Sequence, residues 1–124
     1  MQLSLRAMSL ILCTAGLALG QINTTTMDGI VSDPQGALIP NAEVTVTNNL
    51  TGQAIRTLTN DRGHWAVPSL STATYSVAVS AAGFKKAEKK DVVLDAGIPA
   101  TVNFTLEVGA VSETIEVTGG ADVL

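Results

Sequence analysis

The chain has 124 residues and a formal net charge of −4 at pH 7. An acidic protein does not attract the phosphate backbone of nucleic acids, so we expect no nucleic-acid partner. Only 15% of the residues are charged and 3% are aromatic. However, Val, Ile, Leu and Thr are frequent and alternate along the chain, which argues against disorder and predicts one small folded domain.

The first twenty residues have the composition of an export signal. Arg6 supplies a positive charge, and the fourteen residues 7–20 then carry none. A helix needs about 20 residues to cross a hydrocarbon core of about 30 Å, so this segment is too short to span a membrane. Ala18-Leu19-Gly20 places small residues before a cleavage site. We predict a signal peptide over residues 1–20 with cleavage before Gln21; the alternative is an N-terminal anchor or buried helix.

The single cysteine, Cys13, lies inside this segment. Leu10-Ile11-Leu12 precedes it and lacks the small residue expected before a lipid-modified cysteine. After cleavage the chain has no thiol, so neither a disulfide nor a thiolate metal site is expected. The mature chain is also predicted to contain no membrane span.

From Met27 onward the apolar residues recur with period two, which predicts strands and no helix. Asp33-Pro34-Gln35-Gly36 is typical of a type I turn. Pro68 is predicted to end the fourth strand, because proline cannot donate to a central ladder. Seven short strands at intervals of roughly 8–12 residues predict a small antiparallel Greek-key-type β-sandwich. The predicted strands are Met27–Ser32, Glu43–Asn48, Gln53–Thr59, His64–Val67, Tyr75–Ala81, Lys85–Leu94 and Ala100–Leu106.

The end of the chain has a different pattern. Gly109 interrupts it, residues 111–118 alternate once more, and Gly119-Gly120 follows. We predict an N-terminal lead over residues 21–26, the sandwich over residues 27–107, and a strand or linker over residues 108–124 that leads toward an absent further domain. Order is expected to decrease beyond Gly109.

An ordered set of motifs resembles the carboxypeptidase regulatory-like family of small transthyretin-like sandwiches. The resemblance covers about Met27 to Leu106 and implies the same all-β fold. One departure is Ala73, where the family usually has glycine, which leaves the conformation of the 71–74 turn open. The motifs are Gly29–Gly36, Ile39–Val46, Thr59–Trp65, Pro68-Ser69-Leu70, Tyr75-Ser76-Val77 and Gly83-Phe84.

The stretch Phe104–Thr118 is similar to the exit of the N-terminal module of bacterial TonB-dependent outer-membrane receptors. In those receptors the module follows a signal peptide and precedes a plug and a membrane barrel. The resemblance implies an exported chain in the periplasm, on the periplasmic side of the outer membrane or outside the cell. Its expected partners are a protein or the missing plug and barrel. A membrane barrel needs at least about eight strands, so transport by this sequence alone is not expected.

Few residues suit catalysis or metal binding. His64 is the only histidine, with no second His or Cys in the mature chain to share a metal or assist a nucleophile. No Gly-x-Ser-x-Gly elbow or phosphate-binding glycine loop occurs. Asp91 with Asp95, or Asn60 with Asp61, falls short of the 6–8 oxygens that calcium takes. We therefore expect no enzyme, no catalytic residue, no cofactor and no metal, and an exposed strand position for His64.

The aromatic residues suggest a carbohydrate-binding hypothesis, in which sugars stack on exposed rings, because related sandwiches include starch-binding domains. Trp65, Tyr75 and Phe104 fall on the apolar side of alternating strands, which predicts a role in the core. Phe84, at a Gly-Phe turn, is the one aromatic residue expected at the surface.

The run from Lys85 to Lys90 is basic within an acidic protein. It is either a binding patch for an anionic group or a set of lysines that protects an edge strand from pairing. Together the patterns predict a non-catalytic exported accessory or interaction module, with carbohydrate binding as the alternative. Its candidate ligand or interaction surface comprises Phe84, Lys85, Lys86 and His64.

Overall fold

The computed structural model describes residues 24–110, 114–117 and 122–123. The predicted signal peptide and the cleavage site before Gln21 lie outside these residues. Within them the chain forms ten strands and no helix: β1 (Thr24–Ser32), β2 (Glu43–Asn48), β3 (Ala54–Leu58), β4 (His64–Ser71), β5 (Thr74–Ser80), β6 (Lys86–Val93), β7 (Ala100–Thr101), β8 (Phe104–Thr105), β9 (Thr114–Val117) and β10 (Asp122–Val123).

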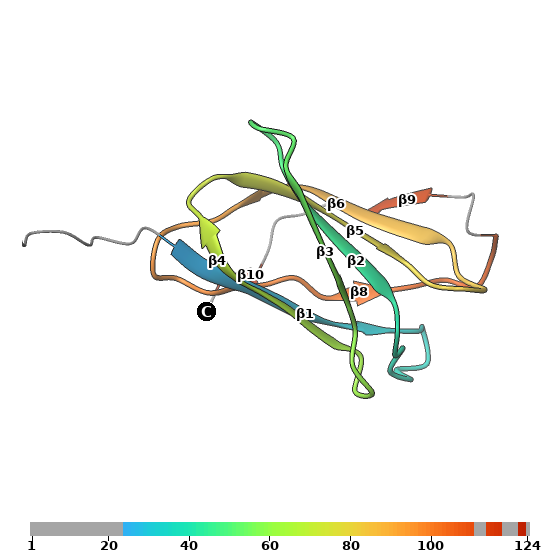
Figure 1. Ribbon diagram of the computed structural model, residues 1–124. Helices are drawn as coiled ribbons and strands as arrows, with labels where there is room; N and C mark the ends of the chain where they lie inside the picture. Colours follow the sequence, from blue (N-terminus) through green and yellow to red (C-terminus); the bar gives the residue numbers. More distant parts are fainter. Residues whose placement is uncertain (1–23, 111–113, 118–121, 124) are drawn as a thin grey trace, which may run out of the picture.

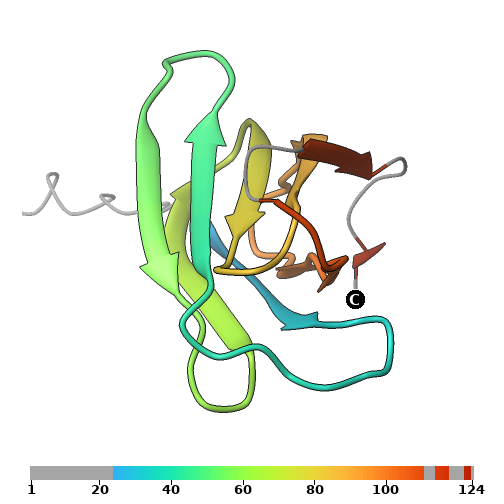
Figure 2. The same ribbon diagram turned by 90° about the vertical axis from the view of Figure 1, so that its right-hand side faces the viewer.

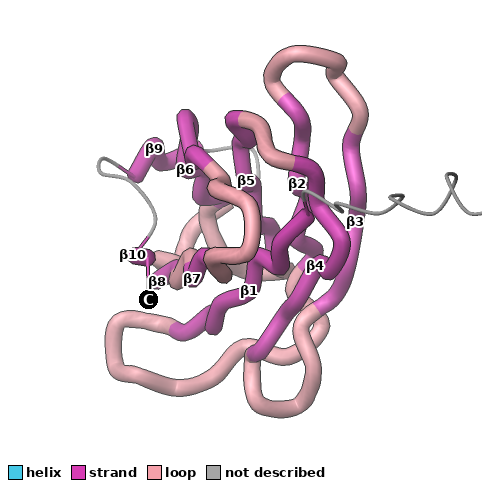
Figure 3. Tube along the Cα trace, turned by 90° about the vertical axis from the view of Figure 1, so that its left-hand side faces the viewer, coloured by secondary structure: helices cyan, strands magenta, loops and turns pink. Residues whose placement is uncertain are grey.

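The strands form two sheets that face each other (Figure 1). The first sheet has the order β10-β7-β1-β4, with β8 also paired to β1, and the second has the order β3-β2-β5-β6-β9. Figure 3 shows the two sheets as two rows of strands, with β3 and β9 at opposite ends of the second. The predicted all-β sandwich is confirmed, although three pairings, β1 with β7, β1 with β8 and β6 with β9, are parallel.

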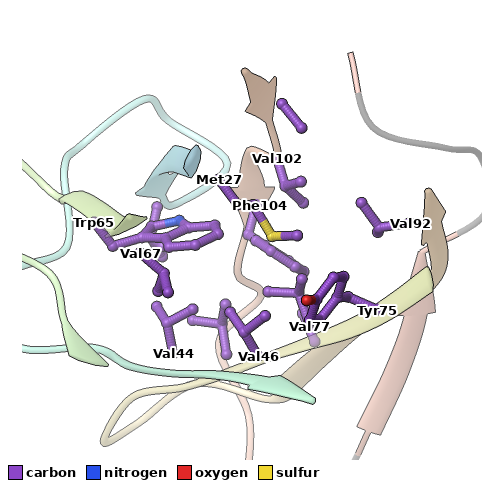
Figure 4. Close-up of a cluster of buried hydrophobic side chains, with 14 of the residues drawn as sticks. Met27, Val44, Val46, Trp65, Val67, Tyr75, Val77, Val92, Val102 and Phe104 are labelled. Carbon is purple, nitrogen blue, oxygen red and sulfur yellow. The ribbon is translucent and has the colours of Figure 1, made fainter. Parts of the chain in front are cut away.

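The alternation of side chains produces the core. In β5, Tyr75, Val77 and Val79 are buried while the residues between them are partly exposed. Trp65 and Phe104 have the two largest fully buried side chains of the described residues, and they lie among the valines of the opposite sheet (Figure 4). The core positions predicted for Trp65, Tyr75 and Phe104 are therefore confirmed.

The packing around Trp65 explains why Gly29 stands in the middle of β1. A Cβ atom at Gly29 would lie 1.8 Å from the carbonyl oxygen of Val102 and 2.9 Å from the indole nitrogen of Trp65. Glycine thus allows the chain at Val102 and the indole ring to approach β1 closely. The buried indole N–H has no hydrogen-bond partner among the described residues.

The fourth strand does not end at Pro68, contrary to the sequence prediction. It continues to Ser71, and its pairing with β1 shifts in register between Thr25 and Met27. Ser69, beside the proline, has a φ of 60°. A bulge of this kind leaves a residue outside the ladder, so a proline can stay within the strand without removing a paired donor.

The last predicted sandwich strand, Ala100–Leu106, is divided into β7 and β8. Both short strands pair in parallel with β1. At the division the side-chain oxygen Oδ1 of Asn103 accepts a hydrogen bond of 2.9 Å from the backbone N–H of Ile30. The asparagine side chain thus replaces one backbone bond of the ladder, which alternation alone does not indicate.

The turn at Ala73 accommodates alanine without strain. Ala73 is absent from the residues with positive φ, so this turn does not require glycine. Its methyl group packs against the core, and the Tyr75 hydroxyl donates a hydrogen bond of 2.8 Å to the carbonyl oxygen of Ser71.

The segment after residue 107 is attached to the sandwich where it is described. Lys85 N–H donates to the carbonyl oxygen of Glu107 at 2.7 Å, and β9 then pairs with β6 from Lys86 to Lys89. The sequence predicts a strand or linker here; the described residues 114–117 form a strand, which extends the second sheet. At the other end, β1 already begins at Thr24, inside the predicted lead.

Candidate functional site

The outer face of the second sheet contains a hollow of about 600 Å³. It extends across the strands from β3 to β6, whose order places them side by side (Figure 2). A volume of this size is within the usual range for ligand sites, about 300–1,000 Å³. The residues that line it are Glu43, Thr45, Thr47, Asn49, Arg56, Ser76, Ala78, Ser80, Lys86 and Glu88.

The floor of the hollow consists of small side chains on the two central strands. In the pairing of β2 with β5, Thr45 lies opposite Ala78, Thr47 opposite Ser76, and Glu43 opposite Ser80. The alternation that directs valines into the core directs these residues outward. Because hydroxyl and methyl groups are short, a partner can approach the sheet backbone closely here.

Charged residues flank this floor on the outer strands. Arg56 on β3 lies opposite Thr45, and Glu88 on β6 lies opposite Ala78, so they end one transverse row of the floor. Three strand spacings of about 4.8 Å separate them, or about 14 Å. Glu43 and Lys86 add a second charge of each sign to the lining. The hollow therefore carries two positive and two negative side chains.

One end of the hollow is fixed by the loop between β2 and β3. Asn49 N–H donates to the carbonyl oxygen of Thr74 at 3.0 Å, and the Ser76 hydroxyl donates to Asn49 Oδ1 at 2.7 Å. Asn48 Oδ1 accepts from the backbone N–H groups of Leu50 and Thr51, which closes the turn. The loop is thus tied to β5 at this end.

The arrangement suits binding of a polar surface. Hydroxyl groups both donate and accept hydrogen bonds, while the charged side chains recognise groups of either sign. The described lining includes no aromatic residue, so stacking on a ring is not what this hollow provides.

Three of the four predicted surface residues are consecutive, but they lie in different surroundings. Lys86 lines the hollow. Phe84 is half-buried and packs against the core rather than standing exposed as predicted. Lys85 lies over Gly109, where an added Cβ atom would be 2.5 Å from its Cγ atom. Of the three, Lys86 alone lines the hollow.

The fourth predicted residue, His64, lies on the outer face of the other sheet. Its Nε2 atom is 3.3 Å from Oδ2 of Asp28, and the Thr101 hydroxyl donates to Oδ1 of the same carboxylate at 3.1 Å. The sequence predicts an exposed histidine; the structure gives a half-exposed one with a carboxylate partner. These contacts join β1 to β4 and β7.

The lysine run does not occupy a free edge. β9 covers β6 from Lys86 to Lys89, so β9 rather than β6 ends this sheet. Lys90 lies 3.9 Å from both Glu88 and Glu116, which bridges the two strands. The protection of an edge predicted for these lysines therefore does not apply to residues 86–89.

The two residue pairs considered for calcium, Asn60 with Asp61 and Asp91 with Asp95, do not form a calcium site among the described residues. Asn60 Oδ1 accepts hydrogen bonds from the backbone N–H groups of Arg62 and His64 and closes the turn before β4. Across the described parts of the chain, His, Cys, Asp and Glu side chains form no group of three or more suited to a metal ion. The same parts contain no helix with the length and apolarity to cross a membrane.

Sequence reasoning did not identify Thr45, Thr47, Ser76 and Ser80 as site residues. The sequence does contain one indication: small hydroxyl residues recur at the outward-facing positions of two strands with alternating polarity. That pattern does not reveal that the two strands are neighbours in the sheet. The pairing of β2 with β5, which are separated by two strands of the chain, creates the hollow.

Comparison with solved structures supports the sandwich fold. The TIE protein of Bacillus anthracis is 18% identical, with a TM-score of 0.60, over 69% of this chain and 17% of that one. Catechol 1,2-dioxygenase of Acinetobacter radioresistens is 16% identical, with a TM-score of 0.57, over 82% and 58%. A candidate carbohydrate-binding protein of Bacteroides uniformis is 20% identical, with a TM-score of 0.54, over 66% and 40%. At these identities the likeness concerns the fold alone.

Among curated proteins no sequence relative was found. The model of the carboxypeptidase regulatory-like domain family matches residues 26–107, which include the floor and the charged sides of the hollow. This match agrees with the motifs between Gly29 and Phe84 and with the two-sheet architecture. The chain therefore belongs to the carboxypeptidase regulatory-like domain family.

Proposed function

We propose that this chain is a non-catalytic accessory module of an exported protein and that it binds a polar partner through the hollow of its second sheet. The observation that carries the proposal is the hollow of about 600 Å³, whose floor consists of small outward-facing hydroxyl residues between charged side chains. Such a surface suits the polar, charge-complementary contacts of an interface between domains.

The partner we propose is the plug or barrel of a TonB-dependent outer-membrane receptor. The support is the similarity of Phe104–Thr118 to the exit of the N-terminal module in such receptors. The small floor residues Thr45 and Ala78 leave space for a partner segment, and Arg56 and Glu88 offer charges at its two sides.

A matched pair of alanines allows this proposal to be tested. Ala78 lies in the floor of the hollow, and Ala66 lies on the first sheet opposite Asp28. Each alanine is replaced, one at a time, by a photo-crosslinking phenylalanine analogue in a chain exported together with the receptor. We expect cross-links to the plug or barrel from position 78 and few from position 66. Equal yields from both positions, or cross-links from 66 alone, would contradict the proposal.

Carbohydrate binding is the second candidate function. It is favoured by the hydroxyl groups of the floor, and a structural neighbour described as a candidate carbohydrate-binding protein shares the fold. Because Trp65, Tyr75 and Phe104 are buried, binding would rely on hydrogen bonds without aromatic stacking, so we expect dissociation constants in the range of about 1 mM or weaker. Titration of the isotopically labelled chain with neutral oligosaccharides, followed by NMR, would give shifts at Thr45 and Ser76 if this candidate is correct.

Export is tested separately by the N-terminus of the mature protein. We expect mass spectrometry of the exported chain to find Gln21 at or near the first position, as the pattern of residues 7–20 predicts. Mature protein that retains Met1 would contradict export with cleavage and would favour an N-terminal anchor.

A further inference from the structure

The two edges of the second sheet carry opposite charges at matching positions. The pairings place five residues in one transverse row on the outer face, which runs from β3 to β9: Arg56, Thr45, Ala78, Glu88 and Glu116. Arg56 ends the row on one edge and Glu116 ends it on the other. Both side chains are exposed, and that of Glu116 is 62% accessible.

The next row, on the inner face, also ends in matching residues. It runs through Thr57, Val44, Val79, Ala87 and Ile115. Thr57 and Ile115 are both half-exposed at their edges. If β9 of one copy pairs with β3 of another and Glu116 faces Arg56, then Ile115 faces Thr57. A single register therefore aligns the charged row and the inner row together.

The strand directions allow this pairing. β6 is antiparallel to β5, β5 to β2 and β2 to β3, whereas β9 is parallel to β6. β9 and β3 therefore run in opposite directions, so a second copy placed beside the first in the same orientation meets it through an antiparallel junction. Antiparallel pairing satisfies the backbone groups of both edges with straight hydrogen bonds.

The edges differ in their protection from pairing. On the first sheet, β4 contains Pro68 and the register shift near Ser69, both of which hinder addition of a strand. β3 contains no proline, and Arg56 is its only charged residue. Ile55 and Leu58 on β3 are 37% and 58% exposed. β3 thus has an accessible edge with apolar side chains on both faces.

We propose that the occupant of the β3 edge is a second copy of this chain, which adds its β9 and continues the five-stranded sheet from one molecule into the next. Association of like edges is disfavoured, because two β3 strands centred on Arg56 oppose two positive charges, and two β9 strands centred on Glu116 oppose two negative ones. The head-to-tail contact instead joins opposite charges and leaves a free edge at each end, which generates open chains of molecules.

The contact is weak because it is small. Strands of five and four residues meet at the junction. Such an edge buries much less than the roughly 1,200 Å² of a stable interface, so association is expected at high local concentration. Glu116 also lies 3.9 Å from Lys90 of its own chain, which competes with the neighbouring Arg56. The inference is independent of the partner proposed for the hollow.

Paired cysteines provide the direct test. In the proposed register Thr114 faces Leu58 of the next copy, so a Leu58→Cys, Thr114→Cys chain would form disulfides between molecules, in a Cys13→Ser background. Within one molecule the two positions lie on strands four spacings apart, about 19 Å, which is too far for a disulfide. We expect a ladder of dimers, trimers and larger species on non-reducing gels under mild oxidation.

Two controls distinguish the junction from random collision. Each single-cysteine chain can form only dimers, and a Leu50→Cys, Thr114→Cys chain places one thiol on the distant β2–β3 loop. The proposal is overturned if the paired chain forms no more trimer than the Leu50 control, or if it remains monomeric at millimolar concentration.

Charge reversal tests the role of Arg56 and Glu116. In the paired-cysteine chain, we expect Arg56→Glu or Glu116→Lys alone to slow ladder formation roughly two- to fivefold, the range given by one unfavourable cross-strand pair. Mixing the two single-reversal chains restores the rate in part, because only the junctions between the two different chains join a lysine or arginine to a glutamate. Equal rates for all these samples would overturn the assigned register.

Discussion

The two outer faces of the sandwich use their polar side chains differently. On the first sheet, Asp28 receives contacts from His64 and Thr101, and Asn103 accepts from the backbone of Ile30. Those contacts attach β4, β7 and β8 to β1. On the second sheet, small hydroxyl residues line a hollow between charged side chains. One face holds its own strands together, and the other carries the polar groups that we propose bind a partner.

The difference follows from how the strands are paired. The central strands of the second sheet have long ladders, with six pairs between β2 and β5, so the backbone alone holds them together. β7 and β8 each contribute only two paired residues to β1, and side chains supplement that short ladder. Polar groups on a sheet face are therefore available for binding where the ladder is already complete.

The largest expected effect concerns the interior that both faces share. Replacing Trp65 with Ala should lower the free energy of unfolding by about 3–5 kcal/mol, because a fully buried ring is lost and a cavity remains. Trp65→Phe should cost clearly less, since it keeps a ring and removes the unpaired indole N–H. Urea denaturation measures both. A loss below 1 kcal/mol for Trp65→Ala would contradict its place in the core.

A second large effect is expected where the first sheet closes around β1. Gly29→Ala would place a methyl group 1.8 Å from the carbonyl oxygen of Val102, a backbone atom that cannot rotate away. We expect a loss of about 1–3 kcal/mol or more, with separation of β7 from β1. Gly52→Ala is not a suitable control, because the exposed Gly52 has a φ of 76° and an alanine there would strain the backbone. The control is Ala66→Gly in β4, a position without a positive φ. Unfolding curves of the two variants provide the comparison.

The polar contacts of the first face should have a moderate effect. Asn103→Ala removes the acceptor for the Ile30 N–H and should cost about 0.5–1.5 kcal/mol. Asn103→Asp keeps a side-chain oxygen at the same position and should retain most of the stability. Hydrogen exchange of the Ile30 amide should accelerate in the Ala variant, and unchanged exchange would refute the role given to Asn103.

The smallest effect is expected for the floor of the hollow. Thr47→Ala or Ser80→Ala should change the unfolding free energy by no more than about 0.5 kcal/mol, as for surface positions outside structural contacts. Calorimetric or chemical unfolding is sufficient to measure it. A cost equal to that of Asn103→Ala would remove the contrast between the two faces.

Much of the fold follows from the sequence because alternation reports directly on burial. The period-two pattern of Tyr75, Val77 and Val79 predicts both the strand and its inward face. It does not reveal that Pro68 lies within a strand, because the bulge that permits this depends on the partner β1. It also does not reveal the parallel pairing of β9, which is set by the distant edge of β6.

The candidate site was harder to predict than the fold. Lys86 was identified because charge is visible in the sequence, and it does line the hollow. Residue type alone points to Phe84 and His64, yet the first packs against the core and the second contacts Asp28. The hydroxyl residues of β2 and β5 form one surface only because the two strands are neighbours in the sheet. The sequence of either strand alone does not indicate that pairing.

We propose that the outer face of the second sheet is the binding surface of this chain. This proposal is tested most directly by NMR of the isotopically labelled chain on addition of the receptor in lipid nanodiscs, which leave both membrane faces accessible. In a transferred cross-saturation experiment, irradiation of this large particle attenuates the resonances of the residues that contact it. We predict selective loss of intensity for Thr45, Thr47 and Ala78, with Asp28 and Ala66 unaffected. Loss centred on Asp28 and Ala66, or no selective loss at all, would contradict the claim.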